Sequence, residues 1–162
     1  MKKTDTSREA FHLIGITVRT NNEREKNWET GVIFPTVQRY FHQNLAASIP
    51  SRQEPGTTYC AYTDYESDHT GDYTYFIGEV VAPDTPLPEG FERLTIPTQK
   101  YAKFTVGPGG MPDVIRNAWL DIWQLTPNEF GGNRRYHTDF EVYDERASDH
   151  NNIITDIYIG IH

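Results

Sequence analysis

The residues best suited to chemistry lie on one predicted strand near the C-terminus, Asp139 to Asp144. Side chains alternate between the two faces of a strand, so Glu141 and Tyr143 share one face. Phe140 and Val142 share the other face, which suits packing against helices. A carboxylate among aromatic rings is suited to an organic cation, because ring faces attract positive charge and the carboxylate supplies the opposite charge. The spacing therefore predicts a cation receptor at Glu141.

Further aromatic side chains are expected to complete this receptor. Alternation in the last predicted strand directs Ile157 and Ile159 towards the helices and Tyr158 towards the face of Glu141. Two tryptophans one turn apart on a predicted helix usually form a core face, although one of them could also reach the pocket wall. The candidate ligand-binding residues are Glu141, Tyr143, Tyr158, Tyr65, Phe76, Trp119 and Trp123.

Two alternatives to a cation receptor remain open from the residues alone. Glu141 and Tyr143 could belong to an ordinary outer sheet face that is half exposed to water. Catalysis has less support, because acid–base chemistry usually needs two groups. Glu79, the other strand carboxylate, is expected on the helix-facing side or at the edge of the sheet. The sequence therefore favours binding over an enzyme, and it assigns no catalytic residue.

The composition argues against metal and cofactor chemistry. The six histidines show no ligand spacing, and the single cysteine, Cys60, has no partner thiol. The glycine-rich stretch at Gly107 lacks the Lys-Ser/Thr of a phosphate-binding loop. A formal net charge of −8 repels nucleic acid and anionic lipid and favours cations. We therefore expect no metal, no cofactor, and no direct contact with nucleic acid or membrane.

The chain is expected in the cytoplasm. Residues Met1 to Glu9 are charged and lack the apolar segment of a signal peptide. No apolar run approaches the roughly 20 residues that a membrane-spanning helix needs. A single cysteine cannot form an internal disulfide, which fits a reducing compartment.

Hydrophobic periodicity predicts the same order of elements in both halves: strand, helix, then a hairpin. A helix beginning near Pro35 lies in the first half, and a helix that opens at Pro112 and ends before Pro127 lies in the second. The predicted strands are 11–19, 58–65, 73–81, 94–96, 101–106, 135–144 and 153–161.

The two predicted hairpins also match residue by residue. Tyr62-Thr63-Asp64-Tyr65 matches Phe140-Glu141-Val142-Tyr143, and Tyr75-Phe76-Ile77-Gly78 matches Ile157-Tyr158-Ile159-Gly160. We therefore predict an internal duplication within a single domain, 1–162. Its repeats cover about 11–81 and 94–161, with a proline-rich linker at about 82–93. The predicted fold class is α+β: duplicated β-α-β-β units form a curved antiparallel sheet, with two helices on one side and a central ligand groove.

Four segments of the second half resemble one known family. They are Glu92 to Gly110, the helix containing Trp119-Leu120-Asp121-Ile122-Trp123, DFEVYDE (Asp139 to Glu145) and DIYIGI (Asp156 to Ile161). Their order and spacing resemble the GyrI-like small-molecule-binding domains, also called AraC-type or bacterial transcription-activator effector-binding domains, including the integron-cassette effector-binding proteins. The first half is similar only in layout. The chain departs from the family at Gly160, where a proline is common.

The resemblance implies two strand-helix-strand-strand units around a groove that binds amphipathic, often cationic and aromatic compounds. It also implies that Glu141 is the partner of the cation. Such domains are commonly fused to a helix-turn-helix, but only about ten residues precede the first predicted strand. The expected function is therefore a stand-alone effector- or drug-binding protein, with any role in transcription depending on a protein partner. Two alternatives are a GyrI-like hydrolase that uses a pocket glutamate and a protein–protein inhibitor.

Overall fold

The computed structural model describes residues 1–162 and contains eight strands in one antiparallel sheet. The order of strands across the sheet is β1-β6-β8-β7-β3-β4-β2-β5. The strands are β1 (Lys2–Arg8), β2 (Phe11–Thr20), β3 (Thr58–Thr63), β4 (Tyr73–Val81), β5 (Glu92–Ile96), β6 (Gln99–Gly109), β7 (Thr138–Tyr143) and β8 (Ile153–Ile161). The helices are α1 (Asn22–Glu25), α2 (Ile33–His42), α3 (Asp113–Ile122) and α4 (Pro127–Phe130), with 3₁₀ turns η1 (Leu45–Ser48) and η2 (Glu145–Ala147).

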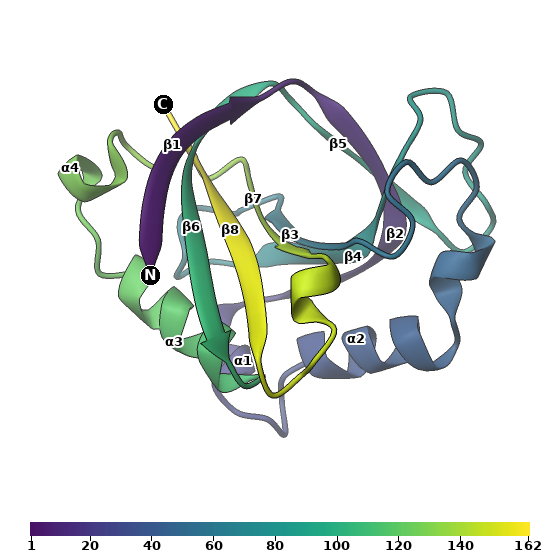
Figure 1. Ribbon diagram of the computed structural model, residues 1–162, viewed down its shortest axis with the longest axis horizontal. Coiled ribbons are helices and arrows are strands. Elements are labelled where there is room, and N and C mark those ends of the chain that lie inside the picture. Colours follow the sequence, from purple (N-terminus) through teal and green to yellow (C-terminus); the bar gives the residue numbers. More distant parts are fainter.

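The sheet curves strongly, and both long helices lie on the same side of it (Figure 1). α3 packs on the half of the sheet formed by β6 and β8, where it buries Ala118, Trp119 and Ile122. α2 packs on the half formed by β2, β3 and β4. The predicted α+β class, the curved antiparallel sheet and the two helices on one side are confirmed.

The opposite, concave face of the sheet has an apolar core of its own, so both faces of the central strands are buried. Phe140 stacks on Tyr158 with ring centroids 4.6 Å apart, and Phe76 belongs to the same cluster. The sequence prediction that Phe140 and Val142 face the helices is therefore wrong. When both faces of a strand are buried, apolar residues no longer mark the helix side.

No strand is predicted from the sequence before residue 11, but Lys2–Arg8 forms the edge strand β1, paired with β6. Its sequence KKTDTSR has no apolar alternation, which is why periodicity misses it. At its end, the Arg8 guanidinium lies 4.2 Å from the centre of the Phe11 ring, and the rings of Tyr59, Phe140 and Tyr158 lie within 5.6 Å. Cation–π contact thus attaches this polar strand to an aromatic core.

Strand register corrects the predicted match between the two hairpins. Tyr62 pairs with Tyr75 in the first hairpin, and Glu141 pairs with Ile157 in the second. If Tyr75 corresponds to Ile157, then Tyr62 corresponds to Glu141 and not to Phe140. The second hairpin is three residues longer between these positions (157 − 141 = 16 against 75 − 62 = 13). A shift of one residue moves every side chain to the other face of a strand, so the predicted match equated Tyr62 with Phe140, although the two lie on opposite faces of the sheet.

Local signals explain the helix boundaries. Pro35 lies in the first turn of α2, as expected, because its missing N–H has no partner there. Pro127 was expected only to stop a helix, but it also begins α4. That short helix has a capping box, in which the Thr126 side chain and Glu129 each accept from the other's backbone N–H.

Two glycines allow β2 and β4 to approach each other closely. Gly15 and Gly78 are directly opposite, and a Cβ on Gly78 would lie 2.2 Å from the carbonyl oxygen of Ile14. Because that atom belongs to the backbone, the two strands would have to separate to make room for it.

We expect Gly78→Ala to lower the free energy of unfolding by about 2–4 kcal/mol in urea titration. Gly110→Ala is the control, because its Cβ would meet nothing closer than 3.8 Å and should change stability little.

Candidate functional site

A cavity of about 800 Å³ lies between the two halves of the chain, on the helix side of the sheet. One wall is α2, the floor is formed by β3, β4 and the end of β7, and the other wall is formed by η2 and the segment before β8. Its lining residues are Phe34, Val37, Gln38, Phe41, His42, Pro55, Gly56, Thr57, Thr58, Cys60, Tyr75, Ile77, Met111, Tyr143, Asp144, Glu145, Ala147, Ser148, His150 and Ile153. A groove shared by both halves was predicted from the duplication.

The wall formed by α2 leaves large apolar side chains uncovered. Phe34 is 69% exposed and Phe41 is 55% exposed, although both line the cavity. Tyr40 is the only buried residue of α2. An amphipathic helix normally covers its apolar face with core, so these phenyl rings are available to a ligand.

Glu141 lies behind the floor of this cavity and is only 3% exposed. Its Oε2 accepts hydrogen bonds from the Tyr62 hydroxyl and from the Trp119 indole N–H, both at 2.7 Å. Its Oε1 accepts from the Tyr143 hydroxyl at 2.6 Å. Three separate elements, β3, α3 and β7, therefore fix the position of one carboxylate.

The carboxylate of Glu141 has hydrogen-bond donors but no cationic partner. The other buried carboxylates form ion pairs: Asp139 with Arg134 at 2.7 Å, Glu79 with Arg52 at 3.3 Å, and Asp156 with Arg146 at 2.7 Å. Burial raises the pKa of Glu141 above its ordinary value, and the hydrogen bonds from Tyr143, Trp119 and Tyr62 offset only part of that rise. A negative charge at this position is costly and lacks an internal counter-ion.

Tyr143 connects the carboxylate with the cavity. Its ring lines the cavity, while its hydroxyl donates to Glu141. Cys60, directly opposite Glu141 across β3 and β7, and Tyr75 complete this part of the floor. Burial raises the pKa of the Cys60 thiol, so thiolate chemistry is disfavoured there.

The structure brings some of the predicted site residues together and separates others. Glu141, Tyr143 and Trp119 are in direct contact. Trp123 lies behind Trp119 at 6.4 Å between ring centroids and stacks on His69. Tyr65 lies on the same side of the sheet, but its hydroxyl donates to Asp139 at 2.6 Å.

Tyr158 and Phe76 do not share the face of Glu141, so the prediction that places them there is wrong. Tyr158 pairs with Phe140 across β7 and β8, and both belong to the aromatic cluster of the concave face. Phe76 lies in the same cluster. These two rings lie on the other side of the sheet from the cavity and do not line it.

Sequence reasoning missed several residues of the site: Tyr62, Tyr75, Phe34 and Phe41. The first two follow from register, because Tyr62 pairs with Tyr75 and occupies the place that corresponds to Glu141. No sequence signal separates Phe34 and Phe41 from ordinary core residues of an amphipathic helix. Their exposure becomes visible only once α2 is placed over the sheet.

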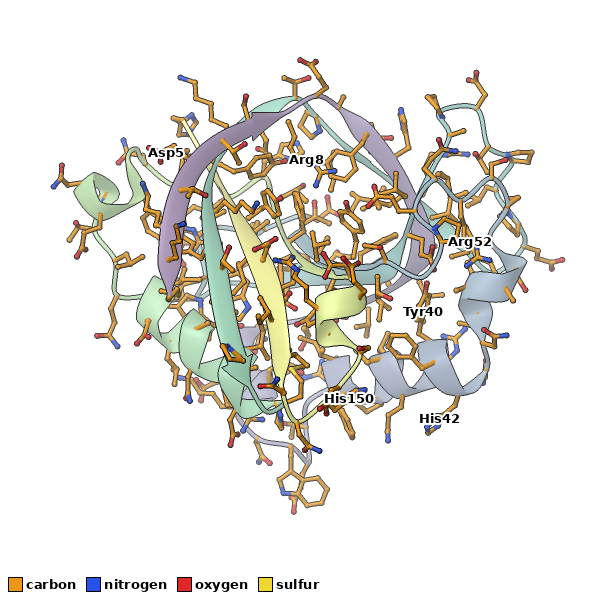
Figure 2. All side chains as sticks on the ribbon, in the orientation of Figure 1. Asp5, Arg8, Tyr40, His42, Arg52 and His150 are labelled. Atoms are coloured by element: carbon orange, nitrogen blue, oxygen red, sulfur yellow. The ribbon has the colours of Figure 1, made fainter.

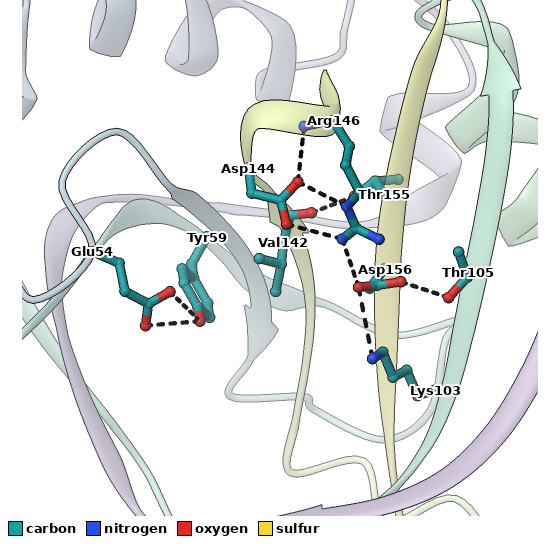
Figure 3. Close-up of polar contacts among 9 residues, drawn as sticks. All are labelled: Glu54, Tyr59, Lys103, Thr105, Val142, Asp144, Arg146, Thr155 and Asp156. Carbon is teal, nitrogen blue, oxygen red and sulfur yellow. Dashed lines mark hydrogen bonds and ion pairs between the residues drawn. The ribbon is translucent and has the colours of Figure 1, made fainter. Parts of the chain in front are cut away.

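A polar network holds the wall formed by η2 in place (Figure 3). Arg146 binds both oxygens of Asp144, at 2.9 and 3.0 Å, and also contacts Asp156 on β8 at 2.7 Å. Lys103 and the Thr105 hydroxyl approach Asp156 from β6. The side chain of Asp144, although it borders the cavity, is thereby neutralised and fixed.

Neither of two other kinds of site is found. No cluster of three or more metal-ligating side chains occurs. No helix is long and apolar enough to cross a membrane.

The buried carboxylate makes folding stability depend on pH in a specific direction. Because the pKa of Glu141 is higher in the folded chain than in the unfolded chain, the folded state binds this proton more tightly. Ionisation of Glu141 therefore lowers the free energy of unfolding, and this loss grows as the pH rises from the pKa of Glu141 in the unfolded chain towards its pKa in the folded chain. We expect Glu141→Gln, which keeps the shape, to raise the free energy of unfolding at neutral pH by about 1 kcal/mol or more. The gain should shrink as the pH is lowered, and urea titrations of both proteins at several pH values measure it.

The chain matches the model of a protein family described as "Integron-associated effector binding protein" over residues 6–161. Among curated proteins, YobU of Bacillus subtilis (strain 168), whose name describes a transcriptional regulator, is 26% identical over 148 residues, covering 91% of this chain and 89% of YobU. The crystal structure of the integron cassette protein VCH_CASS2 of Vibrio cholerae is 27% identical, with a TM-score of 0.75 over 99% of this chain and 95% of that chain.

The structure of SAV2435 bound to tetraphenylphosphonium has a TM-score of 0.78, covering 100% of this chain and 94% of that chain, at 17% identity. At this identity it shows the shared fold. The family match covers nearly the whole chain, and the resemblance to GyrI-like effector-binding domains is confirmed. The chain belongs to the family of integron-associated effector binding proteins.

Proposed function

We propose that this protein binds an amphipathic organic cation in the cavity between α2 and η2, with Glu141 as the counter-ion. The observation that carries the proposal is the unpaired charge: Glu141 is a buried carboxylate without a cationic partner. The cavity beside it is lined by Asp144 and Glu145 but by no lysine or arginine. A ligand cation would supply the missing positive charge.

The surroundings of Glu141 favour a delocalised cation over a small, strongly hydrated one. Tyr143 and Tyr75 present aromatic rings to the cavity, and ring faces attract a cation more strongly when water is excluded. A soft organic cation loses little hydration energy on entering such a site. The three hydrogen-bond donors hold the carboxylate in place and spread its charge over their hydroxyl and indole groups.

The cavity also sets the size and character of the ligand. A volume of about 800 Å³ is typical of sites for drug-sized molecules. Phe34, Val37 and Phe41 on one side and Ile153 on the other offer apolar contact to the body of the ligand. We expect the ligand to be bulky and largely aromatic, with one positive centre.

The comparisons support this proposal without identifying the ligand. SAV2435 has the same fold and is bound to tetraphenylphosphonium, a bulky aromatic cation. YobU is named as a transcriptional regulator. Because a net charge of −8 disfavours binding to DNA, we propose that any regulatory effect passes through a protein partner.

Replacing Glu141 tests the proposed counter-ion. Glu141→Gln should weaken a cationic aromatic ligand by about 2–5 kcal/mol if the pair is desolvated. A neutral ligand of similar shape should be nearly unaffected, because the amide keeps the volume. Tetraphenylphosphonium and neutral tetraphenylmethane-type analogues form a suitable pair, with affinity measured by quenching of tryptophan fluorescence or by calorimetry.

Glu145→Gln is the matched control, since it removes the same charge from the exposed rim of the cavity. Screened by solvent, it should cost about 1 kcal/mol or less. Equal losses for the cationic and the neutral ligand in Glu141→Gln would show that Glu141 is structural and would contradict the proposal.

A further inference from the structure

Two histidines border the cavity from opposite walls. His42 is the last residue of α2, and His150 lies on the connection that leads into β8 (Figure 2). Both side chains are exposed and both line the cavity. The loop carrying His150 is held in place, because the backbone carbonyl of His150 accepts a hydrogen bond from the backbone N–H of Met111 at 2.9 Å. No other lining residue carries a positive charge at any pH near neutrality.

We propose that His42 and His150 make the ligand selectivity of this cavity depend on pH, so that protonation shifts it from simple cations towards zwitterions. This inference rests on the proposed function and concerns the outer end of the ligand, whereas Glu141 concerns its positive centre. Histidine is the side chain whose charge changes between about pH 5 and 8. Two added positive charges therefore alter the cavity without altering its shape.

The other charged groups around the histidines determine the charge of the cavity when both histidines are neutral. From η2, the Glu145 carboxylate is exposed and forms no ion pair, while Asp144 is already paired with Arg146. Beside His150, the Asp149 carboxylate accepts the backbone N–H of Asn151. On α2, Arg39 is exposed and does not line the cavity. With neutral histidines the cavity is therefore acidic, and it disfavours a ligand that carries an anionic group.

Protonation reverses this preference at the outer end. Imidazolium groups repel an approaching cation and attract a carboxylate, with energies that fall with distance and salt. A ligand with its positive centre near Glu141 and a carboxylate near the two histidines gains from both ends. Glu141 itself also takes up a proton more readily as the pH falls, but that change affects both kinds of ligand alike, because both carry the same positive centre.

Rhodamine 123 and rhodamine 110 separate the two effects. They share one delocalised cation and differ in a single group, a methyl ester in rhodamine 123 and an ionised carboxylate in rhodamine 110. Fluorescence polarisation at low salt would give the dissociation constants of both dyes at about pH 7.5 and about pH 5.5. The attraction between Glu141 and the shared positive centre cancels in the ratio of the two constants, and a variant without the histidines isolates their contribution to the ratio.

We expect the affinity of rhodamine 110 relative to rhodamine 123 to rise about three- to tenfold between the higher and the lower pH. In the double variant His42→Gln/His150→Gln, the change should be about twofold or less. His12→Gln is the control, because His12 lies on β2 and does not line the cavity. Its ring forms a hydrogen bond with the Thr95 hydroxyl. This variant should behave as the wild type does.

Each other outcome has a definite meaning. A ratio that does not change with pH in the wild type, or that changes equally in the double variant, overturns the role of the histidines and leaves Glu141 intact. If neither dye binds, or if Glu141→Gln does not weaken both dyes, the proposed function fails, and this inference fails with it.

Discussion

The structure of the site depends on holding one carboxyl group in place inside a protein core. Burial disfavours the ionised form of Glu141, so the fold must supply donors that water would otherwise provide. Tyr62, Trp119 and Tyr143 do this from three elements, which are packed together only because the sheet is curved and α3 lies across it. The positions of β3, β7 and α3 are therefore constrained by a single side chain.

The other buried carboxylates of this protein are paired with cationic side chains of the chain itself, as expected for groups with a purely structural role. Asp139 is fully buried, yet Arg134 lies 2.7 Å away, and the backbone N–H of Gly160 and the Tyr65 hydroxyl complete its contacts. Asp139 and Glu141 are two residues apart on one strand and face the same side. The chain thus provides an internal cation for the first and none for the second, although both occupy similar surroundings. That difference is the main structural argument for the proposal that Glu141 is the counter-ion of a ligand.

Much of this arrangement could be predicted from the sequence, and the errors in assigning strand faces share one physical cause. Alternation and helical periodicity located β7, β8 and α3, and the aromatic residues predicted near Glu141 indicated the site. Alternation cannot say which face of a strand meets the helices when both faces are buried, so Phe140 and Tyr158 were placed wrongly. Register decides the face, and register depends on the length of a connection, which local patterns do not fix. The polar strand β1 was missed for a separate reason, because its sequence KKTDTSR has no apolar alternation.

The helix α2 illustrates why the cavity itself could not be predicted. A helix with one buried residue and two largely exposed phenyl rings is poorly explained as a packing element, since covering Phe34 and Phe41 would stabilise the fold. Their exposure leaves part of the hydrophobic free energy of α2 unrealised, and under the proposed function a ligand in the cavity would recover it. The same rings would then contribute to affinity without contributing to stability of the empty protein. Under the proposed function, the apolar wall and the unpaired carboxylate are two parts of one incomplete core, which a ligand that is both aromatic and cationic would complete.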